Sequence, residues 1–232
     1  MSAGARAAVT PILCAALSRL ARYYGPPPRP FPTGAFQQVL WENVAYLAPD
    51  ARRAAAFKTL KQEVGLTPDA ILHAPLAGLR RATSHGILPD KFARKLREAA
   101  RIALDDFDGD VDAVVDLPLA QAKRALRRFP GIGEPGAEKI LLFSGRHALL
   151  APDSNALRVL QRLGIAPVRK SYASAYAAAR EVSIAQLGAD TAGMLRAHQQ
   201  LRRHGQELCT RSVPACPRCP LVSLCPRIGV AR

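Results

Sequence analysis

The sequence contains no apolar run long enough to cross a bilayer, which excludes a transmembrane span. It also has few stretches in which apolar and polar residues alternate, the pattern typical of β-strands. Apolar residues recur instead at helical spacing along almost the whole chain. These two features predict an all-α fold. At 232 residues, such a fold can bury a full core without disulfides or bound metal.

Acidic residues are also scarce. The chain has 18 Asp and Glu against 33 Lys and Arg, a net charge of +15. Six of the acids lie within residues 105–116, where there is no Lys or Arg, so the remaining surface is more basic than the total suggests. From Thr191 onward there are seven arginines and one acid, Glu207. This imbalance predicts attraction to polyanions such as nucleic acid, although solvated basic helix faces would give the same composition.

Proline and glycine mark the first break in the helical pattern. Residues 25–32 hold five prolines and one glycine, which is too many for a helix and indicates a linker. Before the linker, residues 8–24 are predicted to form a helix that belongs to the folded protein. The further expected helices cover residues 36–47, 52–64, 68–73, 76–82, 91–107, 119–129, 138–143, 156–163, 171–187 and 191–208.

Cysteine is rare, and four of the five cysteines are clustered. They follow the spacing Cys209-x6-Cys216-x2-Cys219-x5-Cys225. Four thiolates this close, in a chain without secretion features, indicate a metal site rather than disulfides. Such a set suits both zinc and an iron–sulfur cluster. The fifth, Cys14, lies on the apolar face of the first predicted helix and is expected to be a buried thiol.

A glycine-rich turn separates two of the expected helices. In the segment Pro130-Gly131-Ile132-Gly133 the missing side chains allow a tight reversal. They also let backbone amides approach a phosphate at the start of the following helix. Gly131, Ile132 and Gly133 are therefore candidate DNA contacts that would bind the backbone without reading sequence. A plain helical hairpin would have the same sequence pattern.

The cysteine spacing, this hairpin, and an aspartate 20 residues after Gly133 together resemble the endonuclease III-like helix-hairpin-helix (HhH-GPD) DNA glycosylases. The resemblance implies a six-helix domain over residues 33–147 that contains the hairpin. It implies a second, iron–sulfur cluster domain formed by residues 1–32 and 148–232. A [4Fe–4S] cluster would be held by Cys209, Cys216, Cys219 and Cys225, and Arg211 between the first two ligands would contact DNA.

The aspartate of this pattern is Asp153. The resemblance makes it the catalytic carboxylate, because cleavage of a nucleotide glycosidic bond passes through an oxocarbenium-like state that a nearby carboxylate stabilises. The same group could orient or deprotonate water. As an alternative, Asp153 caps the helix that begins near Ala156, and the two roles can coexist.

A lysine nucleophile is missing from its family position. Bifunctional members carry it two residues after the second hairpin glycine, where this chain has Pro135. Proline has no amine to form a Schiff base, so water is the expected nucleophile. Lys139, one helical turn later, could share that face. A surface or phosphate-contacting role is the default for Lys139.

The base pocket is the least specific part of the resemblance. Excision from a duplex requires a flipped nucleotide and a side chain that fills the gap. The resemblance places these functions in residues 40–46. Asn43 falls at the wedge position, Trp41 and Tyr46 could stack on the base, and Glu42 could bind its edge. As an alternative, Trp41 and Tyr46 are core residues, since aromatic residues at helical spacing are usually buried.

The combined interpretation is a base-excision-repair glycosylase that removes a damaged or mismatched base from double-stranded DNA. We expect a monomer in the cytoplasm, associated with the nucleoid through DNA. Two alternatives stay open: a bifunctional glycosylase with AP lyase activity, and a non-catalytic DNA-binding module with a structural metal. The sequence does not indicate which base is excised.

Overall fold

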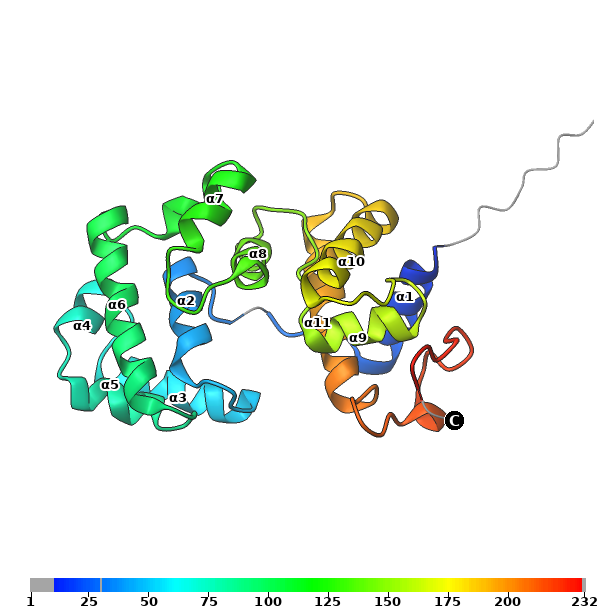
Figure 1. Ribbon diagram of the computed structural model, residues 1–232, viewed down its shortest axis with the longest axis horizontal. Coiled ribbons are helices and arrows are strands. Elements are labelled where there is room, and N and C mark those ends of the chain that lie inside the picture. The colour runs from blue at the N-terminus through cyan, green and yellow to red at the C-terminus, as the bar shows by residue number, and fades with distance from the viewer. Residues whose placement is uncertain (1–10, 30, 231–232) are drawn as a thin grey trace, which may run out of the picture. The chain divides into compact units, whose positions relative to one another are not determined.

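The computed structural model describes residues 11–29 and 31–230. These residues form eleven α-helices and two short 3-10 helices and contain no β-strand (Figure 1). The prediction of an all-α fold is confirmed. Within the part of the chain that is described, no helix is both long and apolar enough to span a membrane.

The chain divides into two compact units. Residues 29–147 form one unit, which we call the continuous unit. Residues up to Pro28 and those from Ala148 onward form the other, which we call the split unit. The sequence interpretation placed the first crossing after residue 32, and the structure places it after residue 28.

The continuous unit is built around its longest helix. α6 (Pro89–Phe107) contacts α2, α4 and α5. Its buried side chains recur every three or four residues, from Phe92 through Leu96 to Ala103, so one face of the helix is apolar. Many of these buried residues are alanines, which let the neighbouring helices approach. The other elements of this unit are α2 (Ala35–Val44), α3 (Asp50–Glu63), α4 (Pro68–His73), α5 (Leu76–Thr83), a 3-10 helix (Asp112–Asp116), α7 (Leu119–Leu126) and α8 (Glu134–Phe143).

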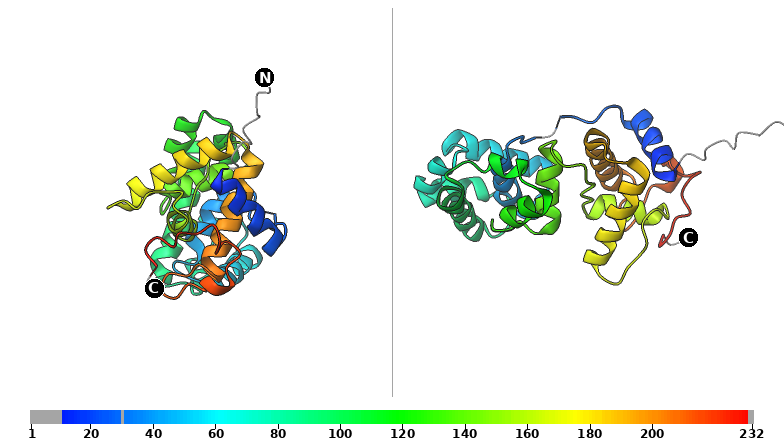
Figure 2. Two further views of the ribbon diagram at one scale, coloured as in Figure 1. Left: turned by 90° about the vertical axis from the view of Figure 1, so that its right-hand side faces the viewer. Right: turned by 90° about the horizontal axis from the view of Figure 1, so that it is seen from above.

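The split unit joins the two ends of the chain. α1 (Ile12–Tyr24) packs against α10 (Tyr172–Leu187) and α11 (Thr191–Glu207), and α11 packs against α9 (Ser154–Arg162) (Figure 2). The α9–α11 crossing is close, because a Cβ at Gly205 would lie 2.6 Å from the carbonyl oxygen of Asn155. A 3-10 helix (Cys216–Arg218) lies in the cysteine-rich tail.

Helix ends differ from the expected ones in two places that affect the site. α2 ends at Val44, and Leu47 follows with a positive φ of 54°, so residues 45–47 form a turn rather than the last helical turn. α8 begins at Glu134, four residues before the expected start, with Pro135 in its first turn, where proline loses no hydrogen bond. Residues 8–10 of the first expected helix lie outside the described residues.

Candidate functional site

The chain reverses direction between α7 and α8 at the first glycine of the hairpin. Gly131 has a φ of +79°, and a Cβ there would lie 2.7 Å from Oδ1 of Asn43, so only glycine fits. Both Gly131 and Gly133 are exposed at the turn. Ile132 differs from them, because its side chain is buried and its N–H donates to Phe129 O at 3.2 Å. Of the three DNA contacts predicted in the hairpin, the two glycines therefore offer the accessible backbone.

Asn43 supports the hairpin from inside. Its side chain is 1% exposed, and Nδ2 donates to Val39 O at 3.0 Å and to Pro130 O at 2.8 Å. A wedge must project into DNA, and this side chain does not project. The prediction of a wedge at Asn43 is corrected: in this structure the residue fixes the turn, since an asparagine on the inner face of α2 reaches the hairpin.

Exposed apolar side chains lie in two loops of the continuous unit, after α2 and before α6. Leu47 is 70% exposed, and Ile87 and Leu88 are each about half exposed in the loop before α6. The two loops are joined, because Ile87 N–H donates to Tyr46 O at 3.1 Å. They also approach closely at Gly86, where a Cβ would meet Tyr46 N at 2.5 Å. The sequence analysis did not name these residues. The signal that could have found them is a large apolar residue in a loop just outside a helix, as at Leu47 and at Ile87 and Leu88.

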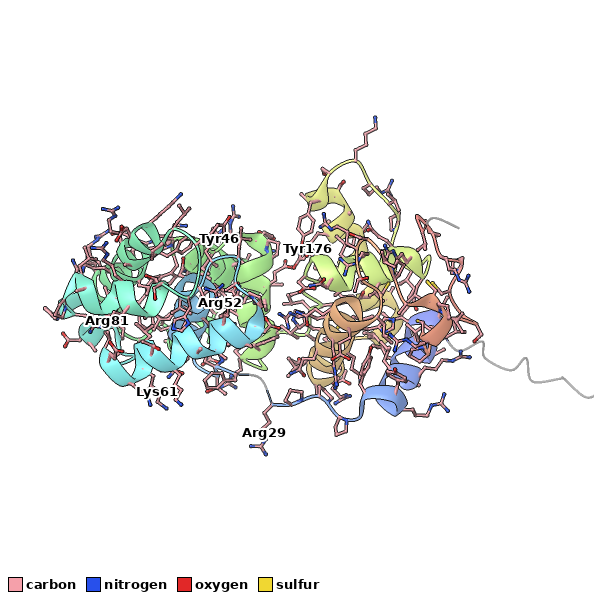
Figure 3. All side chains as sticks on the ribbon, turned by 90° about the horizontal axis from the view of Figure 1, so that it is seen from below. Arg29, Tyr46, Arg52, Lys61, Arg81 and Tyr176 are labelled. Carbon is pink, nitrogen blue, oxygen red and sulfur yellow. The ribbon has the colours of Figure 1, made fainter. Side chains whose placement is uncertain are left out.

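The two aromatic residues of the predicted pocket have different surroundings. Trp41 makes edge-to-face contacts with Phe31 and Phe57 at 5.9 and 5.5 Å between ring centroids. It belongs to an aromatic cluster at the edge of the core, in which Phe57 is buried, Trp41 is partly buried and Phe31 is 59% exposed, so the core alternative holds only in part. Tyr46 stacks on Phe92 at 4.6 Å and keeps 40% of its surface exposed, beside the loop of Leu47 (Figure 3). Only Tyr46 offers an aromatic surface from this loop.

Ion pairs tie α8 to its neighbours. Glu42 pairs with Lys139, which connects α2 to α8, and both side chains are mostly buried. On the other side of the hairpin, Lys123 of α7 pairs with buried Glu138 at 2.7 Å. The predicted base contact Glu42 and the alternative nucleophile Lys139 are thus partners of each other.

Asp153 occupies the N-cap of α9. Its Oδ1 accepts from the backbone N–H groups of Asn155 and Ala156 at 2.9 and 2.8 Å, so the capping role expected as an alternative is present. Its Oδ2 lies 3.1 Å from Nε of Arg202, and the side chain keeps 30% of its surface exposed. The carboxylate is therefore held in one orientation and still reaches solvent.

Tyr172 lies beside this aspartate. Its hydroxyl donates to Pro152 O at 3.4 Å, and its ring is about half exposed at the start of α10. Burial of the hydroxyl, together with the Asp153 carboxylate, raises the pKa of Tyr172. Neither Tyr172 nor Arg202 was predicted from the sequence, since no motif connects them with Asp153.

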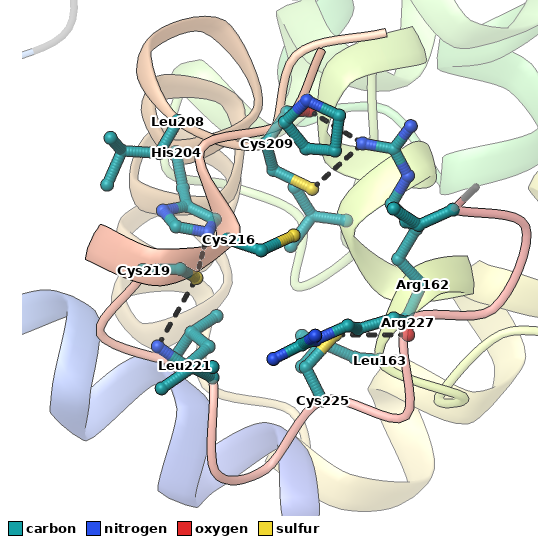
Figure 4. A pocket seen from close by; sticks show the side chains of 14 residues that line it. Arg162, Leu163, His204, Leu208, Cys209, Cys216, Cys219, Leu221, Cys225 and Arg227 are labelled. Atoms are coloured by element: carbon teal, nitrogen blue, oxygen red, sulfur yellow. Dashed lines mark hydrogen bonds between the residues drawn. The ribbon is translucent and has the colours of Figure 1, made fainter. Parts of the chain in front are cut away.

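The four clustered cysteines line one pocket in the split unit, together with His204 and apolar side chains of α9, α11 and the tail (Figure 4). The Cys219 sulfur lies 3.4 Å from Nε2 of His204, and burial lowers the pKa of His204 to about 4. Among the described residues, no three Cys, His, Asp or Glu side chains lie close enough to hold a metal ion. Four thiols around one largely apolar pocket fit the donor set of an iron–sulfur cluster.

Two arginines of α9 fix the first cysteine and its loop. Arg162, which is buried, donates to the Cys209 sulfur at 3.3 Å and to Thr210 O at 2.7 Å. Arg158 donates to Cys209 O at 2.8 Å and to Oδ1 of Asn155 at 2.8 Å. Arg211, the predicted DNA contact, is exposed in the loop that these bonds hold.

Comparison with known proteins shows which sequences this chain is similar to. No protein-family model matches it. Endonuclease III of Sulfolobus acidocaldarius is 26% identical over 193 residues, which cover 82% of this chain and 81% of that protein. DEMETER-like protein 3 of Arabidopsis thaliana is 26% identical over 129 residues, 50% of this chain and 12% of that protein. The chain is a homologue of endonuclease III.

Solved structures agree with this homology at the level of the fold. A trapped endonuclease III–DNA covalent intermediate superposes with a TM-score of 0.75 at 20% identity, covering 93% of this chain and 94% of that one. A thermostable thymine-DNA glycosylase gives a TM-score of 0.74 at 15% identity, covering 93% and 96%. The resemblance to endonuclease III-like glycosylases and their two-domain helical fold, predicted from the cysteines and hairpin, is confirmed.

In this endonuclease III homologue, the predicted site residues fall into two groups. The continuous unit brings together the hairpin, Asn43, and the Glu42–Lys139 pair. The split unit holds Asp153 and the cysteine pocket, which Asn155 and Arg158 connect through hydrogen bonds.

Proposed function

We propose that this endonuclease III homologue is a base-excision DNA glycosylase that cleaves the N-glycosidic bond of a flipped, damaged or mismatched base in double-stranded DNA. The observation that carries the proposal is the Asp153 carboxylate, which is fixed by two backbone amides yet partly exposed. A carboxylate held in this way can stabilise an oxocarbenium-like sugar without reorganising during the reaction. Its second oxygen can orient the attacking water.

Water is the proposed nucleophile. Pro135 occupies the position of the lysine that forms a Schiff base in bifunctional relatives, and it lies in the first turn of α8. The alternative amine, Lys139, is paired with Glu42 and mostly buried. An attack by Lys139 would first have to break this pair, so a hydrolytic glycosylase is favoured over a glycosylase with AP lyase activity.

DNA is bound, in this proposal, through backbone contacts and an apolar edge. The exposed Gly131 and Gly133 let a phosphate approach the start of α8. Arg52 and Lys61, exposed on α3, add positive charge to the continuous unit (Figure 3). Leu47 and Ile87 would fill the gap left by the flipped nucleotide, the role that the sequence assigned to Asn43.

The cysteine pocket is proposed to hold a [4Fe–4S] cluster. Cys209, Cys216, Cys219 and Cys225 supply the thiolates, and the bonds from Arg162 keep Cys209 and the following loop in place. When bound, the cluster would supply structural cross-linking of the tail and no step of base excision. The loop it holds would present Arg211 to the DNA backbone.

The test is excision activity on a panel of duplexes, each with one damaged or mismatched base, comparing wild type with Asp153→Asn. Asparagine is also a good N-cap, so the variant keeps the helix start and loses only the negative charge. We expect strand breaks after alkali with at least one wild-type substrate, and a loss of about 10²–10³-fold or more in the variant. Asp190→Asn, at the start of α11, is the control for an exposed aspartate and should retain activity.

Three results would contradict parts of the proposal. Equal activity of wild type and Asp153→Asn would remove the catalytic role of this carboxylate. A covalent protein–DNA adduct trapped with borohydride would establish an amine nucleophile and favour the bifunctional alternative. Absence of excision on every duplex, with binding retained, would favour the non-catalytic DNA-binding module.

A further inference from the structure

We infer that Arg202 is a positioning residue for Asp153, a role that rests on the proposed glycosylase function. Arg202 lies on α11, 49 positions after Asp153, and its Nε is 3.1 Å from Oδ2 of the aspartate. Both side chains are about one-third exposed, at 32% and 30%. The pair therefore lies where a DNA substrate can reach it.

The two carboxylate oxygens have separate partners. Oδ1 accepts from the backbone N–H groups of Asn155 and Ala156, which are part of the helix start. Oδ2 faces the side-chain donors, Arg202 Nε and, at 3.3 Å, Nδ2 of Asn155. Since Oδ1 is committed to the helix, Oδ2 is the oxygen that a sugar or water would meet. Arg202 thus acts on the oxygen that faces the chemistry.

Arg202 is itself carried on a rigid support. Leu201 and His204 on either side of it are buried, and Gly205 brings α11 against the backbone of Asn155. The guanidinium is planar, and its NH1 also donates to Gln206 Oε1 at 3.4 Å. The carboxylate is therefore fixed from α9 by amides and from α11 by a cation. Loss of the cation leaves the cap intact but lets the side chain turn about its remaining bonds.

The expected consequence is a loss of rate without a loss of binding. A small misplacement of a reacting group can cost about 10²-fold in rate. Arg202→Ala should lower the single-turnover excision rate by roughly 10–100-fold, while the Kd for the same duplex, measured with Asp153→Asn to prevent turnover, changes less than about threefold. Arg202→Lys, which keeps a charge but not the planar donor, should recover part of the rate.

Arg196→Ala is the matched control. Arg196 lies on the same helix and pairs with Asp190 at 3.5 Å on the surface, so its removal changes the net charge equally. The excision rate of Arg196→Ala should equal that of wild type. The thermal unfolding midpoint of Arg196→Ala should lie within a few degrees of wild type, since exposed pairs contribute little to stability. The same measurement on Arg202→Ala checks that its fold is kept.

A double-mutant cycle separates positioning from an independent role. In the Asp153→Asn background, Arg202→Ala should cause no further loss of the residual rate, because the group it positions is already absent. An additional loss equal to that in wild type would overturn the inference. So would a weaker Kd and a shallower salt dependence at unchanged rate, which would make Arg202 a phosphate contact.

Failure of the inference is distinguishable from failure of the proposed function. If wild type excises a base and Arg202→Ala does so at the same rate, only the positioning role falls. If wild type excises nothing from any duplex, the glycosylase proposal falls and the inference falls with it.

Discussion

Asn43 and Gly131 fit together as a pair of residues. The amide of Asn43 holds the carbonyl of Pro130, and the absence of a side chain at Gly131 makes room for it. The inner support of the hairpin thus depends on two residues that lie 88 positions apart in the sequence. The contact between them requires an asparagine at 43 and a glycine at 131, and the apolar pattern of the two helices does not show this requirement.

Gly131→Ala should destabilise the hairpin through both strain and collision. A Cβ at φ +79° is unfavourable, and it would lie 2.7 Å from Asn43 Oδ1. Gly145→Ala is the control, because Gly145 has a similar φ of +75° with nothing within 4 Å of its Cβ. In urea unfolding we expect Gly131→Ala to lose roughly 1–2 kcal/mol more than the control. Equal losses would mean that the Asn43 contact is not tight.

The site was partly predictable at this scale. Local motifs identified the cysteines, the hairpin glycines, and the capping position of Asp153, because each depends on spacing within a short segment. Asn43 was assigned the wedge role from the family resemblance, whereas its bond to Pro130 O depends on how α2 packs against the hairpin, which no local pattern contains. Arg202 could not be predicted, because its contact with Asp153 depends on how α9 and α11 cross.

At the scale of elements, two loops form a single apolar edge in the continuous unit. The chain after α2 and the chain before α6 are joined by the bond from Ile87 to Tyr46, and Gly86 permits the approach. Leu47 has a positive φ and stands out from this edge. Leu47, Ile87 and Leu88 together leave a continuous exposed apolar edge, which suits contact with a partner.

Leu47→Ala should reduce excision from duplex DNA by about tenfold, because a smaller side chain fills less of the gap left by a flipped nucleotide. Excision of the same base from single-stranded DNA should change little, since no gap forms there. Val168→Ala, which truncates another exposed side chain in the split unit, should affect neither substrate. An equal loss on both substrates would argue against the wedge role.

Helices were predictable because their apolar period is local, and most of the expected ranges match within a few residues. The ends of the helices depended on turn residues and on contacts between loops, which the apolar periodicity does not show. α8 starts earlier than its apolar pattern because Pro135 and Gly133 suit a helix start. α2 stops earlier than its pattern because Leu47 adopts a positive φ and the loop turns toward Gly86.

At the scale of the whole molecule, the two compact units differ in what holds them. The continuous unit packs around the apolar face of α6, whereas the tail of the split unit lines the cysteine pocket. With a cluster proposed in that pocket, loss of the metal should weaken one unit and spare the other.

Cys219→Ser should strongly reduce the bound iron and the visible absorbance of the purified protein, because a cluster with three thiolates is held less tightly. In hydrogen exchange, protection should be lost in residues 204–230 and retained in α6. Cys14→Ser is the control: Cys14 donates to Gln186 O at 3.4 Å and lines no part of the pocket, so iron content should be unchanged. Zinc in place of iron in the wild-type protein would contradict the proposed cluster.

The discontinuity of the split unit has a consequence for biosynthesis. α1 buries Leu13, Ala16 and Leu20, and its partners α10 and α11 begin only at Tyr172 and Thr191. At a translation rate of about 5–20 residues per second, roughly ten to thirty seconds separate the emergence of α1 from that of the helices that cover it. The continuous unit is complete in that interval. It can therefore fold on the ribosome before the partners of α1 have been synthesised. During this time the apolar face of α1 is uncovered, so a chaperone that shields short apolar helices would bind this protein at α1.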